Sequence, residues 1–355
     1  MAAAFLASRE PVAYFPGVQD QFGHLISYLR LSITDRCNER CVYCMPQELQ
    51  EWLPHGDILS YEEIARLVRV GASLGVNKLR VTGGEPLTRR GVLELFRLLQ
   101  EIPGIRDLGV STNGSLLARA VPDHGGRSMA ACLRGYGVRT VNISLDTLDP
   151  AAYARITGRN FLAQTLAGIA AAQAAGFGPG EIKLNCVLMR GRNEDQLGPL
   201  IDFAGERGLL LRFIELMPVS TTDVLSDENF LPIATARRII EKHSGSLVPA
   251  PAFKTNGPAA YYTLPERGGQ MIGFIGAMTN LHFCESCNKL RLTCEGKLRP
   301  CLGSYLEFDI RAPLRAGASD AELREFFFEV VARKPKEHDF RDNYQPNRKM
   351  VAIGG

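Results

Sequence analysis

Short runs of β-branched and aliphatic residues alternate with longer amphipathic stretches along residues 29–217. The amphipathic stretches repeat apolar side chains every three or four residues, as helices that bury one face do. Alternation of this kind is typical of a parallel sheet covered by helices. Six runs have the length and composition of buried strands: 29–34 (LRLSIT), 78–84 (KLRVTGG), 108–114 (LGVSTNG), 140–146 (TVNISLD), 182–189 (IKLNCVLM) and 211–217 (LRFIELM).

The stretch after the first run carries the clearest helix start. Ser60 and Glu63 have the spacing of a capping box, and Ile64, Leu67 and Val68 follow at helical spacing. The same spacing predicts further helices at 91–102, 161–177, 195–208 and 235–243. A last amphipathic helix is predicted at 321–335, and we expect it to pack on the body of the protein rather than to form a dimer contact.

Polar or glycine residues end each of the six runs, for example Gly83-Gly84-Glu85 and Asp146. In βα barrels such strand ends meet at one rim, where the active site lies. Six units are too few to close an eight-stranded barrel, so the predicted fold is α/β, an open, partial barrel of the TIM type. We expect an N-terminal extension (1–25), the barrel core (26–220) and a C-terminal region (221–355). That region shows no obvious fold of its own, and we expect it to lie across the open side of the barrel.

Composition and charge narrow the class of protein. The 355 residues are 45% hydrophobic and carry 41 Lys and Arg against 38 Asp and Glu. This near balance argues against a general nucleic-acid binder, so an anionic ligand would need a local site. No apolar run approaches the ~20 residues of a membrane-spanning helix, and the N-terminus lacks a secretion signal. The sequence therefore predicts a cytoplasmic protein with no membrane or nucleic-acid partner.

Nine cysteines are many for a reducing compartment, and seven of them cluster. Clustered cysteines in a cytosolic chain indicate metal. Cys132 and Cys186 stand alone in apolar surroundings and are interpreted as buried small side chains. The two clusters are Cys37, Cys41 and Cys44, and then Cys284, Cys287, Cys294 and Cys301.

The first cluster has the spacing C-x3-C-x2-C directly after the first predicted strand. Soft thiolates select zinc, copper(I) or iron–sulfur clusters, and a structural zinc site normally recruits four ligands. Three thiolates on a 4Fe-4S cluster leave one iron open to a substrate or cofactor. The alternative is a zinc site completed by a distant histidine such as His55.

This spacing, with Tyr43 directly before the third cysteine, resembles the radical S-adenosylmethionine (SAM) superfamily. The resemblance implies that SAM chelates the open iron and is cleaved, after transfer of one electron, to methionine and a 5′-deoxyadenosyl radical. The TGGEP segment (82–86) strengthens the resemblance, which implies a contact of this strand end with the SAM amino group. Gly83 and Gly84 lack a Cβ and allow a ligand to approach the backbone closely.

The second cluster contains a C-x2-C pair, Cys284 and Cys287, followed by Cys301, with Cys294 as a fourth candidate. Taken alone, this pattern leaves a zinc ribbon and an iron–sulfur site open. The wider sequence is similar to the GTP 3′,8-cyclase family of molybdenum cofactor biosynthesis over nearly the whole chain. The matching segments are 28–46, 79–90, 111–114, 141–150, 157–160, 183–193, 211–218, 283–302 and the terminal Gly-Gly.

Membership of this family implies two 4Fe-4S clusters, each with three cysteine ligands: Cys37, Cys41 and Cys44, and Cys284, Cys287 and Cys301. It implies SAM contacts at Tyr43, Gly84, Ser144 and Met217. It implies GTP contacts at Arg30, Arg80, Ser111, Lys183, Lys289, Leu290 and Arg291. The same resemblance implies catalytic roles for Arg212, Arg291, Gly354 and Gly355.

The charged residues within the strand runs support an anion site independently. Arg30, Arg80, Lys183 and Arg212 lie on predicted barrel strands, where an inward charge is costly unless it is paired or faces an anionic ligand. Arginine forks match phosphate oxygens well. The alternative is that some of them, notably Arg212, pair with neighbouring acids such as Glu215.

The resemblance implies a lyase reaction in which the 5′-deoxyadenosyl radical removes hydrogen from C3′ of GTP. The C3′ radical then attacks C8 to give 3′,8-cyclo-7,8-dihydro-GTP. The second cluster would anchor the guanine and supply an electron, with Arg291 as a stabilising group. Implied partners are a second copy of the chain, a flavodoxin or ferredoxin as electron donor, and the downstream cyclic pyranopterin monophosphate synthase.

Three features depart from the family pattern. Lys289 stands where arginine is common, Cys294 is outside the ligand set, and the loop at 176–180 is slightly longer than usual. Two alternatives remain open at this point. One is another radical SAM enzyme with an auxiliary cluster, such as a peptide-modifying maturase. The other is a non-enzymatic zinc or iron–sulfur module.

Overall fold

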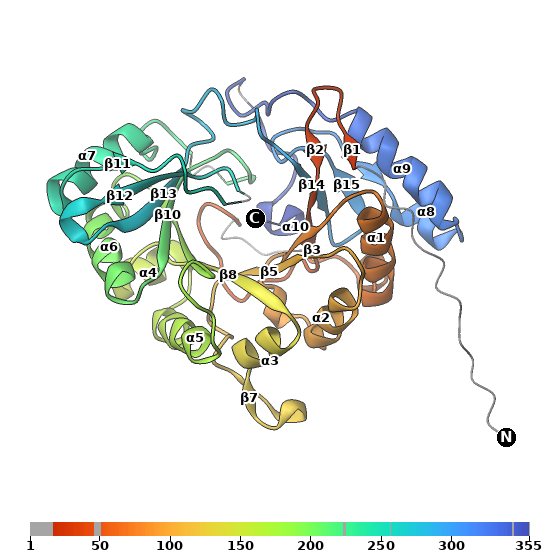
Figure 1. Ribbon diagram of the computed structural model, residues 1–355, viewed down its shortest axis with the longest axis horizontal. Coiled ribbons are helices and arrows are strands. Elements are labelled where there is room, and N and C mark those ends of the chain that lie inside the picture. Colours follow the sequence, from red (N-terminus) through yellow and green to blue (C-terminus); the bar gives the residue numbers. More distant parts are fainter. Residues whose placement is uncertain (1–16, 46–50, 223–224, 256, 343, 355) are drawn as a thin grey trace.

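A computed structural model describes residues 17–45, 51–222, 225–255, 257–342 and 344–354. All six predicted strand runs form neighbouring parallel strands of one sheet, in the order β10-β9-β8-β5-β4-β3. The sheet curves around a central space with most helices on its outer side, so the predicted partial barrel is confirmed (Figure 1). The six strands are β3 (Tyr28–Ser32), β4 (Lys78–Thr82), β5 (Asp107–Thr112), β8 (Val138–Ser144), β9 (Ile182–Leu188) and β10 (Leu210–Glu215).

Among the described residues, the C-terminal region forms no separate sheet, as expected, but adds strands to the barrel sheet. Its strands fall into two groups, one at each edge of the barrel sheet. At one edge β13 pairs in parallel with β10, and at the other β14 pairs in parallel with β3. These pairings satisfy backbone groups that an exposed edge strand would leave unpaired. Further antiparallel strands follow on each side, and the sheet remains open between β11 and β16. The added strands are β11 (Val248–Pro249), β12 (Ala260–Leu264), β13 (Gln270–Ile275), β14 (Lys289–Leu292), β15 (Lys297–Arg299) and β16 (Phe308–Asp309).

The predicted helices occupy the outer face of the sheet. The capping box is confirmed, since Ser60 Oγ accepts from the Glu63 amide at 3.1 Å and Glu63 Oε2 accepts from the Ser60 amide at 2.7 Å. The helices of the barrel part are α1 (Tyr61–Ser73), α2 (Val92–Gln100), α3 (Met129–Gly135), α4 (Pro150–Thr157), α5 (Leu162–Ala174), α6 (Leu197–Glu206) and α7 (Ile233–Ser244). Short elements in the connections are β1 (Val18–Gln19), β2 (Leu25–Ile26), β6 (Ala120–Val121), β7 (Arg127–Ser128), η1 (His55–Asp57), η2 (Pro86–Thr88), η3 (Pro122–His124), η4 (Glu194–Gln196) and η5 (Pro265–Arg267).

The last three helices are α8 (Arg311–Arg315), α9 (Asp320–Ala332) and α10 (Met350–Ile353). Helix α9 packs against the body of the protein as expected: it buries Leu323 and Phe327, and Arg66 of α1 donates to Asp320 at 2.9 Å. Helix α10 lies inside the curve of the sheet, far from α9 (Figure 1). The end of the described chain therefore reaches the central space.

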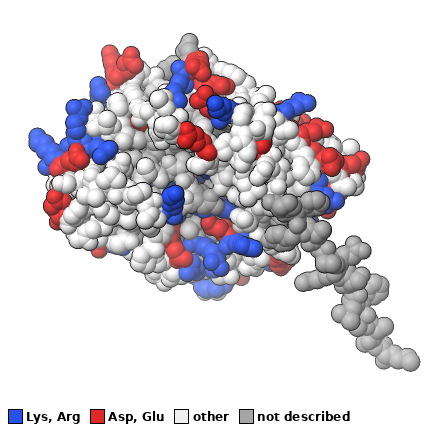
Figure 2. Space-filling view, turned by 45° about the horizontal axis from the view of Figure 1, so that its top comes forward, with Lys and Arg blue, Asp and Glu red and all other residues white. Residues whose placement is uncertain are grey.

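The surface carries both signs of charge. Basic and acidic side chains are interspersed on the face in Figure 2, in line with a formal net charge of +3. Among the described residues, no helix is long and apolar enough to cross a membrane.

Candidate active site

One cavity of about 340 Å³ lies inside the curve of the sheet and is lined by both cysteine clusters. The barrel strands contribute their inward side chains, and the loops after them close the rim, as in other βα barrels. Nearly every residue implicated by the sequence lines this cavity: Arg30, Cys37, Cys41, Tyr43, Cys44, Arg80, Gly84, Ser111, Ser144, Lys183, Arg212, Met217, Cys284, Cys287, Lys289, Arg291 and Cys301.

The loop that carries Cys37, Cys41 and Cys44 follows β3 and is tied to helix α4. The Arg40 amide donates to the Thr157 carbonyl at 2.7 Å, and the Val42 amide donates to the Ile156 carbonyl at 2.9 Å. Tyr43 donates its hydroxyl to Asp146, just beyond β8, at 2.8 Å. These bonds hold the cysteine loop over the ends of strands that are distant in sequence.

The glycines after β4 have a packing role that the sequence did not reveal. A Cβ on Gly84 would overlap the carbonyl oxygen of Arg36, and the Gly84 amide donates to the Thr34 carbonyl at 2.8 Å. The glycine segment therefore packs directly on the start of the cysteine loop. Its backbone approaches another backbone closely, in addition to lining the cavity.

Three carboxyl groups missed as site residues surround the N-terminal cysteines: Glu39, Glu85 and Asp146. Burial raises the pKa of Glu39 and of Glu85 to about 7, and that of Asp146 to about 6. Glu85 accepts from the Asn113 amide at 2.7 Å and from the Thr112 hydroxyl at 2.8 Å. Glu85 and Asp146 were visible in the sequence as strand-end residues, but their partners were not.

The C-terminal cysteines line the cavity from the opposite part of the chain. Cys284 and Cys287 precede β14, and Cys301 follows β15. Lys334 is 2% exposed and donates to Cys287 Sγ at 3.5 Å and to the Pro300 carbonyl at 2.5 Å. Its cation beside a thiol stabilises the thiolate that a metal requires. The sequence did not single out Lys334, which lies in the predicted helix segment 321–335 but beyond the end of α9.

The donor set fits iron–sulfur clusters. In the part of the chain that the structure describes, no three His, Cys, Asp or Glu side chains are arranged to hold a metal ion. Each triplet brings three thiolates to the cavity, and thiolates are the ligands of iron–sulfur clusters. His55, the possible fourth zinc ligand, is exposed in η1 and does not line the cavity. Each cysteine triplet therefore offers the donor set that a 4Fe-4S cluster requires.

The remaining cysteines lie outside the cavity lining. Cys294 is fully buried, and its nearest polar partner is Glu295 Oε2 at 3.7 Å. Cys132 and Cys186 are buried in the hydrophobic core, as the sequence predicts. Cys294 therefore does not line the cavity with the second triplet.

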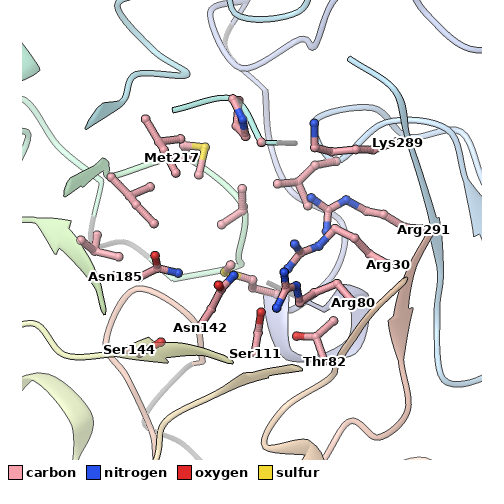
Figure 3. Close-up of a pocket in the computed structure, with 18 of the residues that line it drawn as sticks. Arg30, Arg80, Thr82, Ser111, Asn142, Ser144, Asn185, Met217, Lys289 and Arg291 are labelled. Atoms are coloured by element: carbon pink, nitrogen blue, oxygen red, sulfur yellow. The ribbon is translucent and has the colours of Figure 1, made fainter. Parts of the chain in front are cut away.

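Three arginines form a row across adjacent strands. In the sheet register, Arg291 of β14 lies opposite Arg30 of β3, and Arg30 lies opposite Arg80 of β4. Figure 3 shows these three side chains on one side of the pocket, facing Met217 and Asn185. Like charges directly opposite each other on strands are destabilising, so the row indicates an anionic ligand.

The sheet makes room for this row. Arg80 donates to the carbonyls of Val110 and Thr140 at 3.2 and 3.1 Å, and a Cβ on Gly109 would overlap its guanidinium group. Burial and the nearby Arg30 lower the pKa of Arg291 to about 9, and burial together with Arg212 and Arg80 lowers the pKa of Lys183 to about 8. In the cavity lining, basic side chains therefore outnumber acidic ones.

The suggested Arg212–Glu215 pair is wrong. Arg212 donates to Asn185 Oδ1 at 2.7 and 3.0 Å. Glu215 instead accepts from the backbone amides of Ile233, Met278 and Thr279. The two side chains are three residues apart on a strand, where alternation turns them to opposite faces.

Leu290 differs from its neighbours on β14, because its side chain is 1% exposed and belongs to the hydrophobic core. Alternation along β14 turns Lys289 and Arg291 to the cavity and Leu290 to the outer layer. Any contact of Leu290 with a ligand would run through its backbone. At the chain end, Arg291 Nη1 donates to the Gly354 carbonyl at 2.6 Å, while Gly355 lies outside the described residues.

Further lining residues were missed, among them Tyr28, Lys78, Thr82 and Asn142. Lys78 pairs with Asp107 at 2.5 Å and lies two residues before Arg80 on β4. The period-two alternation of a strand would have placed Lys78 on the same face as Arg80, and Tyr28 on the same face as Arg30.

Comparison with known proteins shows which families the chain matches. The Radical SAM superfamily matches residues 31–204, and Molybdenum Cofactor Synthesis C matches residues 209–340. A GTP 3′,8-cyclase of Pelotomaculum thermopropionicum is 45% identical over 338 residues, which cover 95% of this chain and 100% of that protein. A GTP 3′,8-cyclase of Paracoccus denitrificans is 46% identical over 326 residues, which cover 90% and 89%.

Solved structures resemble the fold. SuiB of Streptococcus suis bound to S-adenosylmethionine superimposes with a TM-score of 0.59 at 15% identity, covering 93% of this chain and 78% of SuiB. The structure of anSMEcpe with bound AdoMet gives a TM-score of 0.59 at 13% identity, covering 88% and 82%. These likenesses concern the architecture alone. Identity above 40% over almost the full length of the curated relatives means that the chain belongs to the GTP 3′,8-cyclase family.

Proposed function

We propose that this chain is a radical SAM GTP 3′,8-cyclase, a lyase that joins C3′ and C8 of GTP in the first step of molybdenum cofactor biosynthesis. One observation carries the proposal: a single cavity is lined by two cysteine triplets and by the arginine row. The reaction needs sites for two clusters and for a triphosphate, and the two triplets and the arginine row supply them in one cavity.

The N-terminal triplet would hold a 4Fe-4S cluster that, with SAM, supplies a 5′-deoxyadenosyl radical for removal of hydrogen from C3′. Around it, the chain orients and encloses SAM. Tyr43 is fixed through its hydroxyl bond to Asp146, and Gly84 offers backbone without a Cβ. Ser144 at the end of β8 and Met217 beyond β10 provide hydroxyl and thioether contacts.

The substrate lies, in this proposal, against the cationic wall. Arg30, Arg80, Lys183 and Lys289 bind phosphate oxygens, and Ser111 contributes a hydroxyl group. The C-terminal triplet would hold the second 4Fe-4S cluster beside the guanine. Lys289 is a point charge that can follow a phosphate group, but it cannot form the bidentate contact that an arginine makes.

We assign three groups to the reacting end of the site. Arg291, with its carbonyl partner Gly354, would stabilise charge on the purine. Arg212, oriented by Asn185, supplies positive charge from β10. The glycine tail, Gly354 and Gly355, brings backbone without side chains into a narrow space.

The proposal extends to partners and organisation. The active form would be a cytoplasmic homodimer, reduced by a flavodoxin or ferredoxin, whose product passes to cyclic pyranopterin monophosphate synthase. The division into an extension (1–25), a barrel core (26–220) and a C-terminal region (221–355) is part of the same proposal.

Anaerobic incubation with GTP, SAM and a strong reductant tests the activity. The expected products are 5′-deoxyadenosine and 3′,8-cyclo-7,8-dihydro-GTP in equal amounts. Release of 5′-deoxyadenosine with GTP left intact would favour a different radical SAM reaction. Absence of both products from protein with intact clusters would overturn the proposal.

A further inference from the structure

Tyr28 lies between two lysines at the inner face of the sheet. In the register of adjacent strands, Lys289 of β14 lies opposite Tyr28 of β3, and Tyr28 lies opposite Lys78 of β4. The ammonium nitrogens of Lys289 and Lys78 lie 5.7 and 5.2 Å from the centre of the phenol ring. Cations at these distances from an aromatic ring are attracted to its face.

The phenol oxygen meets the arginine row. Arg30 Nη1 donates to Tyr28 Oη at 3.2 Å, and Arg80 Nε lies 3.5 Å from the same oxygen in a longer, weaker contact. Tyr28 lines the cavity but is only 4% exposed. The Tyr28 oxygen is thus a buried hydrogen-bond acceptor in the cavity. Its donors are Arg30 and Arg80, which the proposed function assigns to the triphosphate.

The charges that face Tyr28 are mostly positive. Its own strand offers Arg30, β4 offers Lys78 and Arg80, and β14 offers Lys289 and Arg291. On the far strands are Lys183 and Arg212, and Asp107 of β5 is engaged by Lys78 at 2.5 Å. Burial by itself would raise the pKa of Tyr28, but Arg30, Arg80 and Lys78 together lower it to about 7.

We propose that the Tyr28 phenol is the internal counter-anion of this cationic site: it loses its proton to solvent in the substrate-free protein and regains one when a nucleoside triphosphate binds. This inference rests on the proposed function for the identity of the nucleotide. Phosphate oxygens take over the arginines, so the attraction that stabilised the phenolate disappears while the burial that opposes it remains. Tyr28 then becomes a neutral hydroxyl that can donate to a phosphate oxygen.

Binding of GTP should therefore take up close to one proton at pH 8. By linkage, proton uptake weakens binding as pH rises, up to about tenfold for each pH unit above the pKa of the free protein. Lys183 titrates in the same range and acts in the same direction. The contribution of Tyr28 must hence be isolated as a difference between matched proteins.

The test uses the protein with both clusters assembled under anaerobic conditions, without reductant, so that no turnover occurs. Wild type, Tyr28→Phe and Tyr262→Phe are compared. Tyr262 is a matched control, because Arg237 contacts its ring at 4.5 Å and its hydroxyl at 3.4 Å outside the cavity lining. The first readout is the near-ultraviolet tyrosinate absorbance between pH 6 and pH 9, before and after addition of GTP or of inorganic tripolyphosphate.

We expect a tyrosinate signal with a midpoint near pH 7 in wild type and Tyr262→Phe, absent in Tyr28→Phe and reversed by either ligand. Calorimetry in two buffers of different ionisation enthalpy should give close to one more proton taken up per GTP in wild type than in Tyr28→Phe at pH 8. A signal that persists in Tyr28→Phe, never appears in wild type or ignores both ligands would overturn the inference. Reversal by tripolyphosphate but not by GTP would overturn the proposed substrate and leave the counter-anion intact.

Discussion

A single methyl group added at Gly84 should prevent the N-terminal cluster, and with it SAM, from binding. A Cβ at Gly84 would overlap the Arg36 carbonyl, so Gly84→Ala must displace the start of the cysteine loop. We expect this variant to fold but to assemble only the C-terminal cluster, losing about half of the iron and all SAM binding. Iron analysis and SAM calorimetry measure both effects. Gly56→Ala is the control, because no atom lies within 4 Å of its Cβ, and equal iron in the two variants would refute the packing role.

Lys183 shows a conflict between stability and binding. The fall of its pKa from 10.5 to about 8 on folding means that the folded state disfavours the charged form. The cost is present at pH 7, where the lysine is charged in both states. It disappears as pH rises through about 8 towards 10.5, so stability from this group increases over that range.

Lys183→Met should therefore raise the free energy of unfolding at pH 7, by at most about 3 kcal/mol. It should also weaken GTP binding by tenfold or more, since a buried cation that faces the ligand is lost. Thermal unfolding of the cluster-loaded protein and calorimetry with GTP check the two effects. A variant that loses stability, or that binds GTP as wild type does, contradicts this explanation.

Residues of this kind were partly accessible from the sequence. Basic residues within apolar strand runs are unusual, which singled out Arg30, Arg80, Lys183 and Arg212, and all four line the cavity. Tyr28 escaped because it lies just before the predicted run 29–34, and Lys78 escaped because, as the first residue of the run 78–84, it looks like a surface lysine. Lys334 escaped because a lysine beyond a helix end gives no hint that it reaches a thiol 47 residues earlier in the chain.

Among the elements, helix α9 carries a buried phenylalanine directly beside an exposed one. Phe327 is 2% exposed, whereas Phe328 is 38% exposed on the next position of the helix. Phe327→Ala should lower the free energy of unfolding by about 3–5 kcal/mol, because it leaves a cavity. Phe328→Ala should change it by less than about 1 kcal/mol. Denaturant unfolding of the two variants makes the comparison, and equal losses would mean that α9 is not packed in this orientation.

The chain end is predicted to act in the reaction rather than in the stability of the fold. Gly354 adopts φ 81°, a Cβ there would lie 2.6 Å from Thr82 Cγ2, and its carbonyl accepts from Arg291. Deletion of Gly354 and Gly355 should abolish cyclisation while iron content and SAM binding stay normal. Gly354→Ala should act in the same direction through overlap with Thr82. Retained turnover in the deletion variant would exclude the tail from the site.

At the scale of the molecule, the two cysteine triplets come from loops more than two hundred residues apart and share one cavity. Cys37, Cys41 and Cys44 lie in one loop after β3, whereas Cys284, Cys287 and Cys301 flank the β14–β15 pair. Because the two triplets share no segment, the two clusters should assemble independently. Cys301→Ala should halve the iron content and remove GTP binding, with SAM binding unchanged. Cys294→Ala is the matched control and should retain both clusters, since Cys294 is fully buried and outside the cavity lining. Loss of iron in Cys294→Ala would reassign it as a ligand.

The sequence by itself determined the six barrel strands and most of the helices around them, although it did not predict α3 and α4, and it set apart the clustered cysteines that line the cavity. Those features are local: strand and helix periodicity, a capping box and cysteine spacing all act over a few residues. Only the tertiary structure decided how the C-terminal region extends both sheet edges and which residues share a row. Edge pairing and register depend on strands distant in the chain, so neither the arginine row nor the position of Tyr28 between two lysines can be derived from local spacing. The same distance hid the close approach of Gly84 to Arg36, which arises only when one strand end packs on the loop after another.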